Sequence, residues 1–187
     1  VCLDFGQPDG VVVDGVQVFR MHAPGVGWPV LRFVHPGLTS VWQAMRRADA
    51  DVYYQRAAGA LTAFVVAFSK LHARRSVFAG AHDLDFAPSL PLIRFGRDRW
   101  LVRWALAHVD AITTQTRRQA QACLSATGRQ ALWVRNVGEL ATPSAAAHGP
   151  VIWVGSVKVA KCPRAFVELA RRFPGRQFRL VGGGRCR

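Results

Sequence analysis

The sequence predicts an α/β protein built on a parallel β-sheet. Short apolar runs of the kind found in buried strands alternate about four times with segments whose apolar residues recur every three or four positions. After a break in composition, the same strand–helix–strand order begins again at residue 151. Such alternation is typical of a parallel sheet with right-handed crossovers. Half of the residues are hydrophobic, which is enough for a sizeable core.

The first 36 residues contain only short apolar pieces. Residues 11–13 and 16–19 flank Asp14-Gly15, a pair that favours a β-hairpin. Residues 24–29 are rich in proline and glycine and predict a loop. We expect another short strand over residues 31–34, before His35-Pro36.

A regular rhythm follows from Ser40 onward. We expect helices over residues 41–48, 57–68, 100–108 and 116–127, and strands over residues 51–54, 76–81, 111–114 and 131–134. Thr116 and Gln119 have the spacing of a capping box at a helix start, and Gly128 is a typical residue just past a helix end. Residues 84–97 carry two prolines and predict a loop.

A composition change divides the chain. Residues 1–140 form the predicted first domain, residues 141–150 a linker of small residues and proline, and residues 151–187 the start of a second domain. The second domain begins with an apolar run, Val151–Val154, that predicts a strand buried on both faces. It continues with a helix from Pro163, a strand over residues 178–181 and a turn of three glycines; the helix has one apolar face, made by Phe166, Leu169, Ala170 and Phe173.

The net charge is +14, from 25 Lys and Arg against 11 Asp and Glu, and it favours anionic partners. The basic residues are scattered rather than gathered in a block, which argues against nucleic acid and favours a solvated basic surface. The four cysteines lie far apart without zinc-binding spacing, so free thiols are expected. We find neither a signal peptide nor an apolar run long enough to span a bilayer.

Ligands of open α/β sheets bind beyond the carboxyl ends of the strands. The residues expected there are polar, cationic or glycine: His82, Asp83, Gln115, Asn136, residues 155–161 and Gly182–Gly184. Together they predict a cleft between two Rossmann-like domains that binds a phosphate-bearing ligand. Each also has a structural explanation: a hydrogen-bonded histidine, a capping aspartate, turn residues, and an ordinary strand–helix turn with solvated lysines.

Three segments in the same order resemble a known family. They are residues 47–56, residues 110–138, and above all residues 153–163, which read Trp-Val-Gly-Ser-Val, then Lys-Cys-Pro after three variable positions. The pattern resembles the retaining glycosyltransferases of family 4, also called group 1 glycosyl transferases, which have the GT-B fold. The resemblance covers most of the chain from about residue 31. It implies two Rossmann-like domains, an acceptor-side domain followed by the start of a donor-binding domain.

The resemblance also implies the function. The full-length enzyme would move a sugar from a nucleoside-diphosphate sugar to a hydroxyl of a carbohydrate or lipid-linked acceptor, with retention of configuration and without a metal or other cofactor. It would act in bacterial polysaccharide or glycolipid synthesis, in the cytoplasm or peripherally at the inner face of the membrane. Lys161 matches the lysine that contacts the donor diphosphate, and His82 the histidine beside the transferred sugar. Gly155, Ser156 and the glycines Gly182, Gly183 and Gly184 would line the donor site, although Ser156 stands where many relatives have arginine.

Other interpretations remain open at this point. The first and last residues suggest a fragment that lacks much of the donor domain, including the Glu-containing motif of the family, and we expect no transfer activity from the fragment itself. The chain could instead be a non-catalytic, basic Rossmann-like module that binds a nucleotide or nucleic acid, or a truncated gene product without activity.

Overall fold

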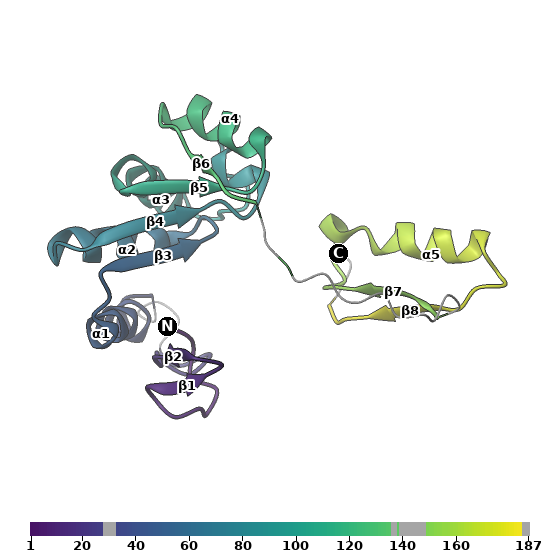
Figure 1. Cartoon of the computed structure of the whole chain (residues 1–187), viewed down its shortest axis with the longest axis horizontal. Helices are drawn as coiled ribbons and strands as arrows, with labels where there is room; N and C mark the ends of the chain where they lie inside the picture. The colour runs from purple at the N-terminus through teal and green to yellow at the C-terminus, as the bar shows by residue number, and fades with distance from the viewer. Residues whose placement is uncertain (28–32, 136–137, 139–148, 185–187) are drawn as a thin grey trace. The chain divides into compact units, whose positions relative to one another are not determined.

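A computed structural model describes residues 1–27, 33–135, 138 and 149–184 of the chain. It divides into two compact units, Val1–Val137 and Gly138–Arg187, which are described separately (Figure 1). Most of the predicted linker and Asn136 lie outside the described residues. Within the described part, no helix combines the length and the apolar character needed to cross a membrane.

The N-terminal segment contains the predicted hairpin. Strand β1 (Val11–Val13) pairs antiparallel with β2 (Val16–Val18), and Val13 lies opposite Val16. Asp14 and Gly15 join them with φ angles of 49° and 78°. Positive φ at both central residues is what a two-residue hairpin turn of primed type requires, so this prediction is confirmed.

The strand expected over residues 31–34 is wrong where the structure describes it. Phe33 and Val34 begin a helical turn, η1 (Phe33–Leu38), that leads into helix α1 (Thr39–Ala48). The Thr39 and Ser40 hydroxyls donate hydrogen bonds to the carbonyls three residues earlier, at 3.3 and 3.1 Å. A short apolar run does not distinguish a strand from a helical segment, which is why the sequence misled here.

The first unit is built on the predicted parallel sheet. Its strands are β3 (Val52–Arg56), β4 (Arg75–Ala79), β5 (Ala111–Thr114) and β6 (Leu132–Trp133), paired in parallel in that order. The connecting helices are α2 (Ala60–Leu71), α3 (Gly96–His108) and α4 (Arg117–Thr127). The loop expected over residues 84–97 is shorter than predicted, because Asp83–Phe86 form a 3₁₀ turn, η2, and α3 already begins at Gly96.

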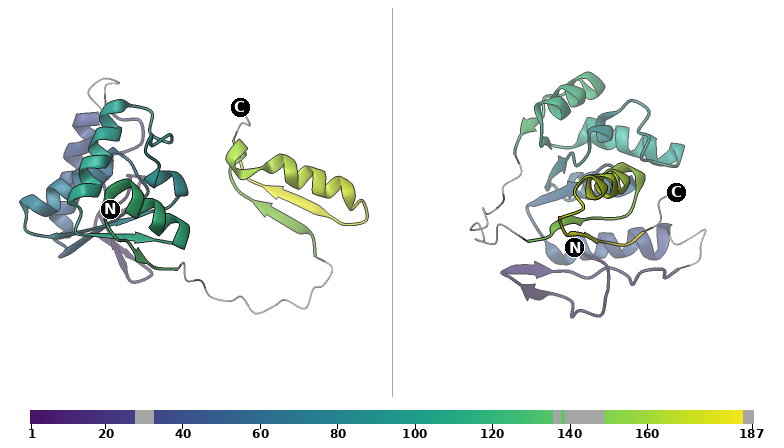
Figure 2. Two further views of the ribbon diagram at one scale, coloured as in Figure 1. Left: turned by 90° about the horizontal axis from the view of Figure 1, so that it is seen from above. Right: turned by 90° about the vertical axis from the view of Figure 1, so that its right-hand side faces the viewer.

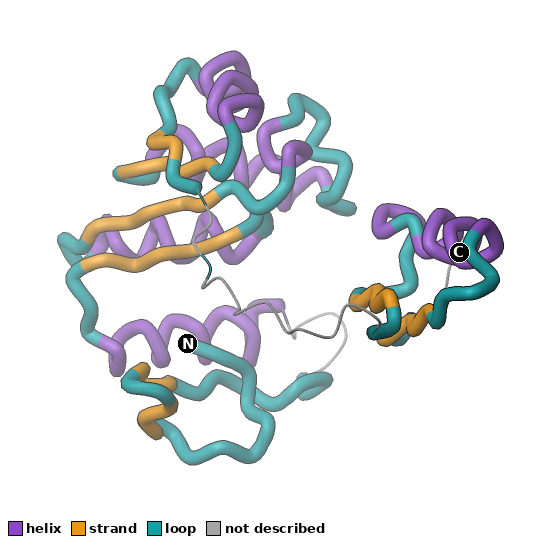
Figure 3. Tube along the Cα trace, turned by 45° about the vertical axis from the view of Figure 1, so that its right-hand side comes forward, coloured by secondary structure: helices purple, strands orange, loops and turns teal. Residues whose placement is uncertain are grey.

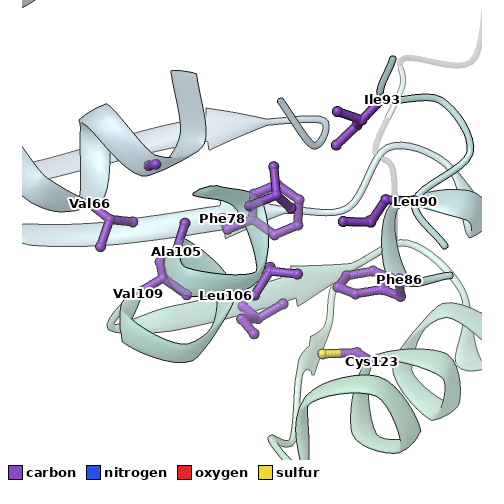
Figure 4. Close-up of a cluster of buried hydrophobic side chains, with 12 residues drawn as sticks. Val66, Phe78, Phe86, Leu90, Ile93, Ala105, Leu106, Val109 and Cys123 are labelled. Carbon is purple, nitrogen blue, oxygen red and sulfur yellow. The ribbon is translucent and has the colours of Figure 1, made fainter. Parts of the chain in front are cut away.

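One face of this sheet carries the core. Because the strands follow one another in chain order, right-handed crossovers place the connecting helices on the same side of the sheet, as Figures 1 and 2 show. The side chains that alternate toward this side are buried, among them Tyr53, Phe78 and Ile112. Within the cluster, the rings of Phe78 and Phe86 pack edge to face with their centroids 6.0 Å apart (Figure 4). The opposite face exposes 52% of Val52, 62% of Tyr54 and 64% of Leu132.

The second unit is a single strand–helix–strand repeat (Figure 3). Strand β7 (Val151–Val154) leads through a 3₁₀ turn, η3 (Val159–Lys161), to helix α5 (Pro163–Arg172) and then to β8 (Phe178–Val181), which pairs in parallel with β7. Phe166 of the helix packs against Trp153 and Phe178, with ring centroids 6.5 and 5.5 Å apart.

The elements of this unit match the prediction, but the burial of β7 does not. Ile152 is 55% exposed and Val154 is 74% exposed. One helix covers only one face of the two-stranded sheet, so the alternate residues of the apolar run stay accessible. The predicted burial of this strand on both faces is therefore wrong in the present chain.

Candidate functional site

The carboxyl edge of the four-stranded sheet holds the candidate residues of the first unit. The turn after β4 contains His82 and Asp85, both fixed by hydrogen bonds. The Asp85 carboxylate is 3% exposed, and its Oδ2 accepts the backbone N–H groups of Ala81 at 2.8 Å and His82 at 3.0 Å. His82 Nδ1 accepts the N–H of Leu84 at 3.1 Å, which requires the proton of a neutral ring to be on Nε2. The exposed His82 ring can therefore donate a hydrogen bond from Nε2 to a ligand.

A glycine keeps this turn close to its neighbour. A Cβ atom at Gly80 would lie 2.6 Å from Cε2 of the buried Phe86 ring. The Gly80 N–H donates to the carbonyl of Thr113 on the adjacent strand at 2.9 Å. Gly80 thus lets η2 fold down on the core while the backbone stays paired with β5, and this packing fixes the position from which His82 projects.

Helix α4 begins just after the carboxyl end of β5. Thr116 caps the helix: its Oγ1 accepts the N–H of Gln119 at 3.1 Å. Gln119 Oε1 accepts the N–H of Gln115 at 2.9 Å, one residue earlier than a capping box requires. The predicted helix start is confirmed, with this shift in the second hydrogen bond, and Gly128 ends the helix with a φ of 68°, as predicted.

An arginine–tryptophan cluster (Arg117, Trp133 and Arg135) lies beside this helix start. The guanidinium carbons of Arg117 and Arg135 are 4.7 and 4.9 Å from the centroid of the Trp133 ring. The indole N–H donates to the Gln115 carbonyl at 3.1 Å, which fixes the ring at the sheet edge. This cluster is absent from the sequence prediction because residues 117 and 133 become neighbours only through the pairing of β5 with β6.

Three carboxylates of the first unit, those of Asp49, Asp51 and Asp110, lie at the opposite edge of the sheet. Asp110, just before β5, accepts the Ser76 N–H and hydroxyl at 2.8 Å each and pairs with Arg75 at 3.2 Å. Desolvation by partial burial raises the pKa of Asp110, but these hydrogen bonds and the Arg75 charge outweigh it and hold that pKa below its ordinary value. Arg74 pairs in the same way with Asp49 and Asp51, at 2.6 and 2.8 Å.

In the second unit, glycines bring the two strand-end turns together. The Gly155 N–H donates to the Val181 carbonyl at 3.0 Å, and the Val157 N–H to the Gly183 carbonyl at 3.0 Å. A Cβ atom at Gly182, whose φ is 154°, would lie only 1.7 Å from the Gly155 carbonyl oxygen. The turn after β8 is thus laid directly against the turn after β7, a close approach of backbones that only glycine allows.

The cations of this unit lie between β7 and α5. Lys158 and Lys161 are both exposed, and neither forms an ion pair with a carboxylate of the described residues. The Lys161 N–H donates to the Lys158 carbonyl at 2.9 Å, which closes η3 just before the helix start. Cys162, with a φ of 47°, and Pro163 then begin α5 without a side-chain cap on its first turn. A lysine next to a helix N-terminus is a suitable partner for an anion.

The predicted site residues therefore fall into two groups. Gly155, Ser156, Gly182, Gly183 and Gly184 come together at one edge of the second unit, with Lys161 in the same connection. His82 belongs to the first unit. Asp83, a further candidate, is exposed and lies 3.8 Å from Arg118.

The sequence prediction also missed Asp85. The signal that could have identified Asp85 is its spacing. It lies three residues after the strand-end His82, where an aspartate can accept the backbone N–H groups that precede it in a turn. Asp85 also lines a pocket of about 490 Å³ between η2, α3 and α4, with Phe86 and Leu106 among its apolar lining residues. His82 is not among the residues of this pocket. In the described ranges, no group of three His, Cys, Asp or Glu side chains is placed to hold a metal ion.

Comparison with protein-family models and with curated proteins yields no match for this chain.

Proposed function

We propose that this chain is part of a metal-independent, retaining glycosyltransferase of the GT-B class, which takes a nucleoside-diphosphate sugar as donor and a carbohydrate or lipid-linked hydroxyl as acceptor. The observation that carries the proposal is the turn between β7 and α5. There Lys161 lies exposed and without an ion-pair partner among the described carboxylates, next to a helix start, in the position that the family pattern assigns to the lysine on the donor diphosphate.

The packing of the glycine turns supports the same assignment. Gly183 has no atom within 4 Å of a Cβ built on it, so it leaves room beside the strand-end turns for a ligand to approach the backbone closely. Ser156 is exposed in the same turn, where its hydroxyl could donate to a phosphate oxygen. An ordinary strand–helix connection would also contain these glycines, so the experiment must test Lys161.

In the proposed reaction, the bond between the anomeric carbon and the diphosphate oxygen breaks, and a bond to the acceptor oxygen forms on the same face of the sugar. The acceptor hydroxyl gives its proton to the departing diphosphate oxygen, so no further base is needed. Lys161 and the positive end of α5 would stabilise the negative charge on the departing diphosphate, an effect that needs no metal. His82, whose Nε2 carries the ring proton in the neutral form, would donate a hydrogen bond to a sugar hydroxyl and orient it.

Nucleotide binding to the whole chain tests the proposal. We expect uridine diphosphate or guanosine diphosphate to bind in isothermal titration calorimetry, and Lys161→Ala to weaken binding by about tenfold, the effect of losing one charge-assisted hydrogen bond. Lys158→Ala is the matched control, because Lys158 is equally exposed and lies three residues away in the same turn. We expect it to change affinity by less than about threefold. Equal effects of the two substitutions, or none, would remove the basis for the donor-turn assignment.

A further inference from the structure

The arginine–tryptophan cluster of the first unit has the properties of a built anion site. Trp133 is 39% exposed, and its ring is held by the hydrogen bond from its N–H to the Gln115 carbonyl. The guanidinium carbons of Arg117 and Arg135 lie over that ring, 4.7 and 4.9 Å from its centroid. Contact with one ring keeps the two guanidinium groups near each other, and each still has N–H donors to offer.

The two positive charges of the cluster are not neutralised. Neither Arg117 nor Arg135 forms an ion pair with any carboxylate in the described ranges, whereas the neighbouring Arg118 approaches Asp83 at 3.8 Å. The cluster also adjoins the positive end of α4, which begins at Arg117.

An unpaired polar group lies next to the cluster. Thr114 is the register partner of Trp133 in the β5–β6 ladder and is 1% exposed. Its Oγ1 is buried and has no hydrogen-bond partner within the part of the chain that the structure describes. Burying a hydroxyl without a partner is costly, so this group needs an explanation, and it lies at the carboxyl end of a strand, where open α/β sheets bind ligands.

We propose that the arginine–tryptophan cluster binds a phosphate monoester, so that the first unit has a phosphate site of its own. A monoester carries close to two negative charges at neutral pH and offers three acceptor oxygens, which matches two guanidinium groups on one ring. A phosphodiester carries one charge and fits less well. The site is built from residues of the first unit alone, and the inference does not depend on the transferase proposal, which places the donor diphosphate at Lys161 of the second unit.

Calorimetry on the whole chain with glycerol 3-phosphate, in 150 mM salt to screen the general positive charge, tests the inference. We expect binding that weakens by about tenfold or more in the double variant Arg117→Gln/Arg135→Gln, since each lost charge-assisted hydrogen bond costs affinity. Arg94→Gln is the matched control. Arg94 is also exposed, and its guanidinium carbon lies 5.3 Å from the centroid of the Phe95 ring. Because this is a single guanidinium–ring contact without a second arginine on the ring, we expect less than a twofold change.

A second variant separates the built site from net charge. Trp133→Ala keeps both arginines but removes the ring that holds them, and we expect affinity to fall by about three- to tenfold. Circular dichroism must show the same secondary structure for each variant. We expect dimethyl phosphate to bind at least about tenfold more weakly than glycerol 3-phosphate, because it has one charge.

Three results would overturn the inference: no binding of glycerol 3-phosphate at millimolar concentration, equal losses in the Arg94 and the Arg117/Arg135 variants, or equal binding of dimethyl phosphate. Loss of glycerol 3-phosphate binding on Lys161→Ala alone would also overturn it, because the ligand would then occupy the turn of the second unit. Since the nucleotide test uses Lys161 and this one uses Arg117 and Arg135, failure of either proposal leaves the other standing.

Discussion

Removing the Asp110 carboxylate should destabilise the first unit measurably. Asp110 joins the amino-terminal ends of β4 and β5: Oδ2 accepts two hydrogen bonds of 2.8 Å from Ser76, and the Asp110 N–H donates back to the Ser76 hydroxyl at 3.2 Å. Ser76 is fully buried, so Asp110→Ala leaves its N–H and hydroxyl without their acceptor. Hydrogen bonds to a charged group contribute about 1.5–3 kcal/mol each. Because the Asp110 side chain is 28% exposed, water can take the place of the lost carboxylate in part, and this reduces the loss of stability.

The expected loss is about 2–3 kcal/mol, or roughly 10 °C in the melting temperature of a unit of this size. Differential scanning calorimetry on the whole chain measures it, with the transition of each unit fitted separately. Arg75→Gln is the control. It removes only the ion pair between Asp110 and Arg75. Because the Arg75 side chain is 77% exposed, we expect a loss of no more than about 0.5 kcal/mol.

The loss of stability in Asp110→Ala should also become smaller as the pH falls. Burial raises the pKa of Asp110, but the Ser76 hydrogen bonds and Arg75 lower it further, so the folded-state pKa lies below the unfolded one. The stabilisation is therefore complete above the unfolded pKa of about 3.9 and disappears as the pH falls through the folded pKa. The difference between Asp110→Ala and the parent chain should be largest near pH 7 and shrink below about pH 4. Equal losses in Asp110→Ala and Arg75→Gln at pH 7 would refute the reasoning.

The remaining predictions concern a glycine turn and two thiols. Gly182→Ala should unfold or rearrange the second unit, because the new Cβ would overlap the Gly155 carbonyl and the φ of residue 182 is 154°. The control Gly175→Ala should be tolerated, because no atom lies within 4 Å of its new Cβ. Amide hydrogen exchange of β7 and β8 distinguishes the two outcomes. Iodoacetamide at pH 8 should label the exposed Cys162 much faster than Cys123, since burial raises the pKa of the Cys123 thiol and excludes the reagent. Peptide mass spectrometry over time measures both rates, and comparable labelling in the folded chain would contradict the packing of α4.

The sequence predicted the fold well where the pattern was local. Asp14-Gly15 specified a two-residue turn, Thr116 and Gly128 marked the ends of α4, and apolar runs located the strands. These features depend on backbone conformations and side-chain reach over a few residues, so they can be read from the chain directly. The burial of Val151–Val154 could not, because it depends on how many strands and helices surround the run, and the same four residues would suit a central strand.

The positions of the candidate site residues in the fold were predictable to a similar extent. The positions of His82 and Lys161 after strands followed from the strand pattern, and both are exposed at carboxyl edges of their units. Asp85, which holds the backbone beneath His82, and the neighbours Arg117 and Trp133 were not predicted. The first depends on the geometry of a 3₁₀ turn and the second on the register between β5 and β6, and neither follows from composition or spacing.

The structure changes the interpretation of the positive charge. Composition alone favoured a uniformly solvated basic surface, yet the arginines of the first unit differ in their ion pairing. At the amino-terminal edge of the sheet, Arg74 and Arg75 are neutralised by aspartates. At the carboxyl edge, Arg118 approaches Asp83 at 3.8 Å and the Asp85 carboxylate accepts backbone N–H groups. Arg117 and Arg135 have no described carboxylate partner at this edge.

The second unit repeats this arrangement on a smaller scale. Lys158 and Lys161 are exposed in the connection that follows the carboxyl end of β7, and neither has an ion-pair partner within the described ranges. Each unit therefore has cations without a described ion-pair partner at the strand ends where α/β sheets bind ligands. Holding like charges at one edge raises the free energy of the folded chain, and an anion bound there would lower it. A phosphate-bearing ligand at either edge, as proposed above, would be stabilised by these cations.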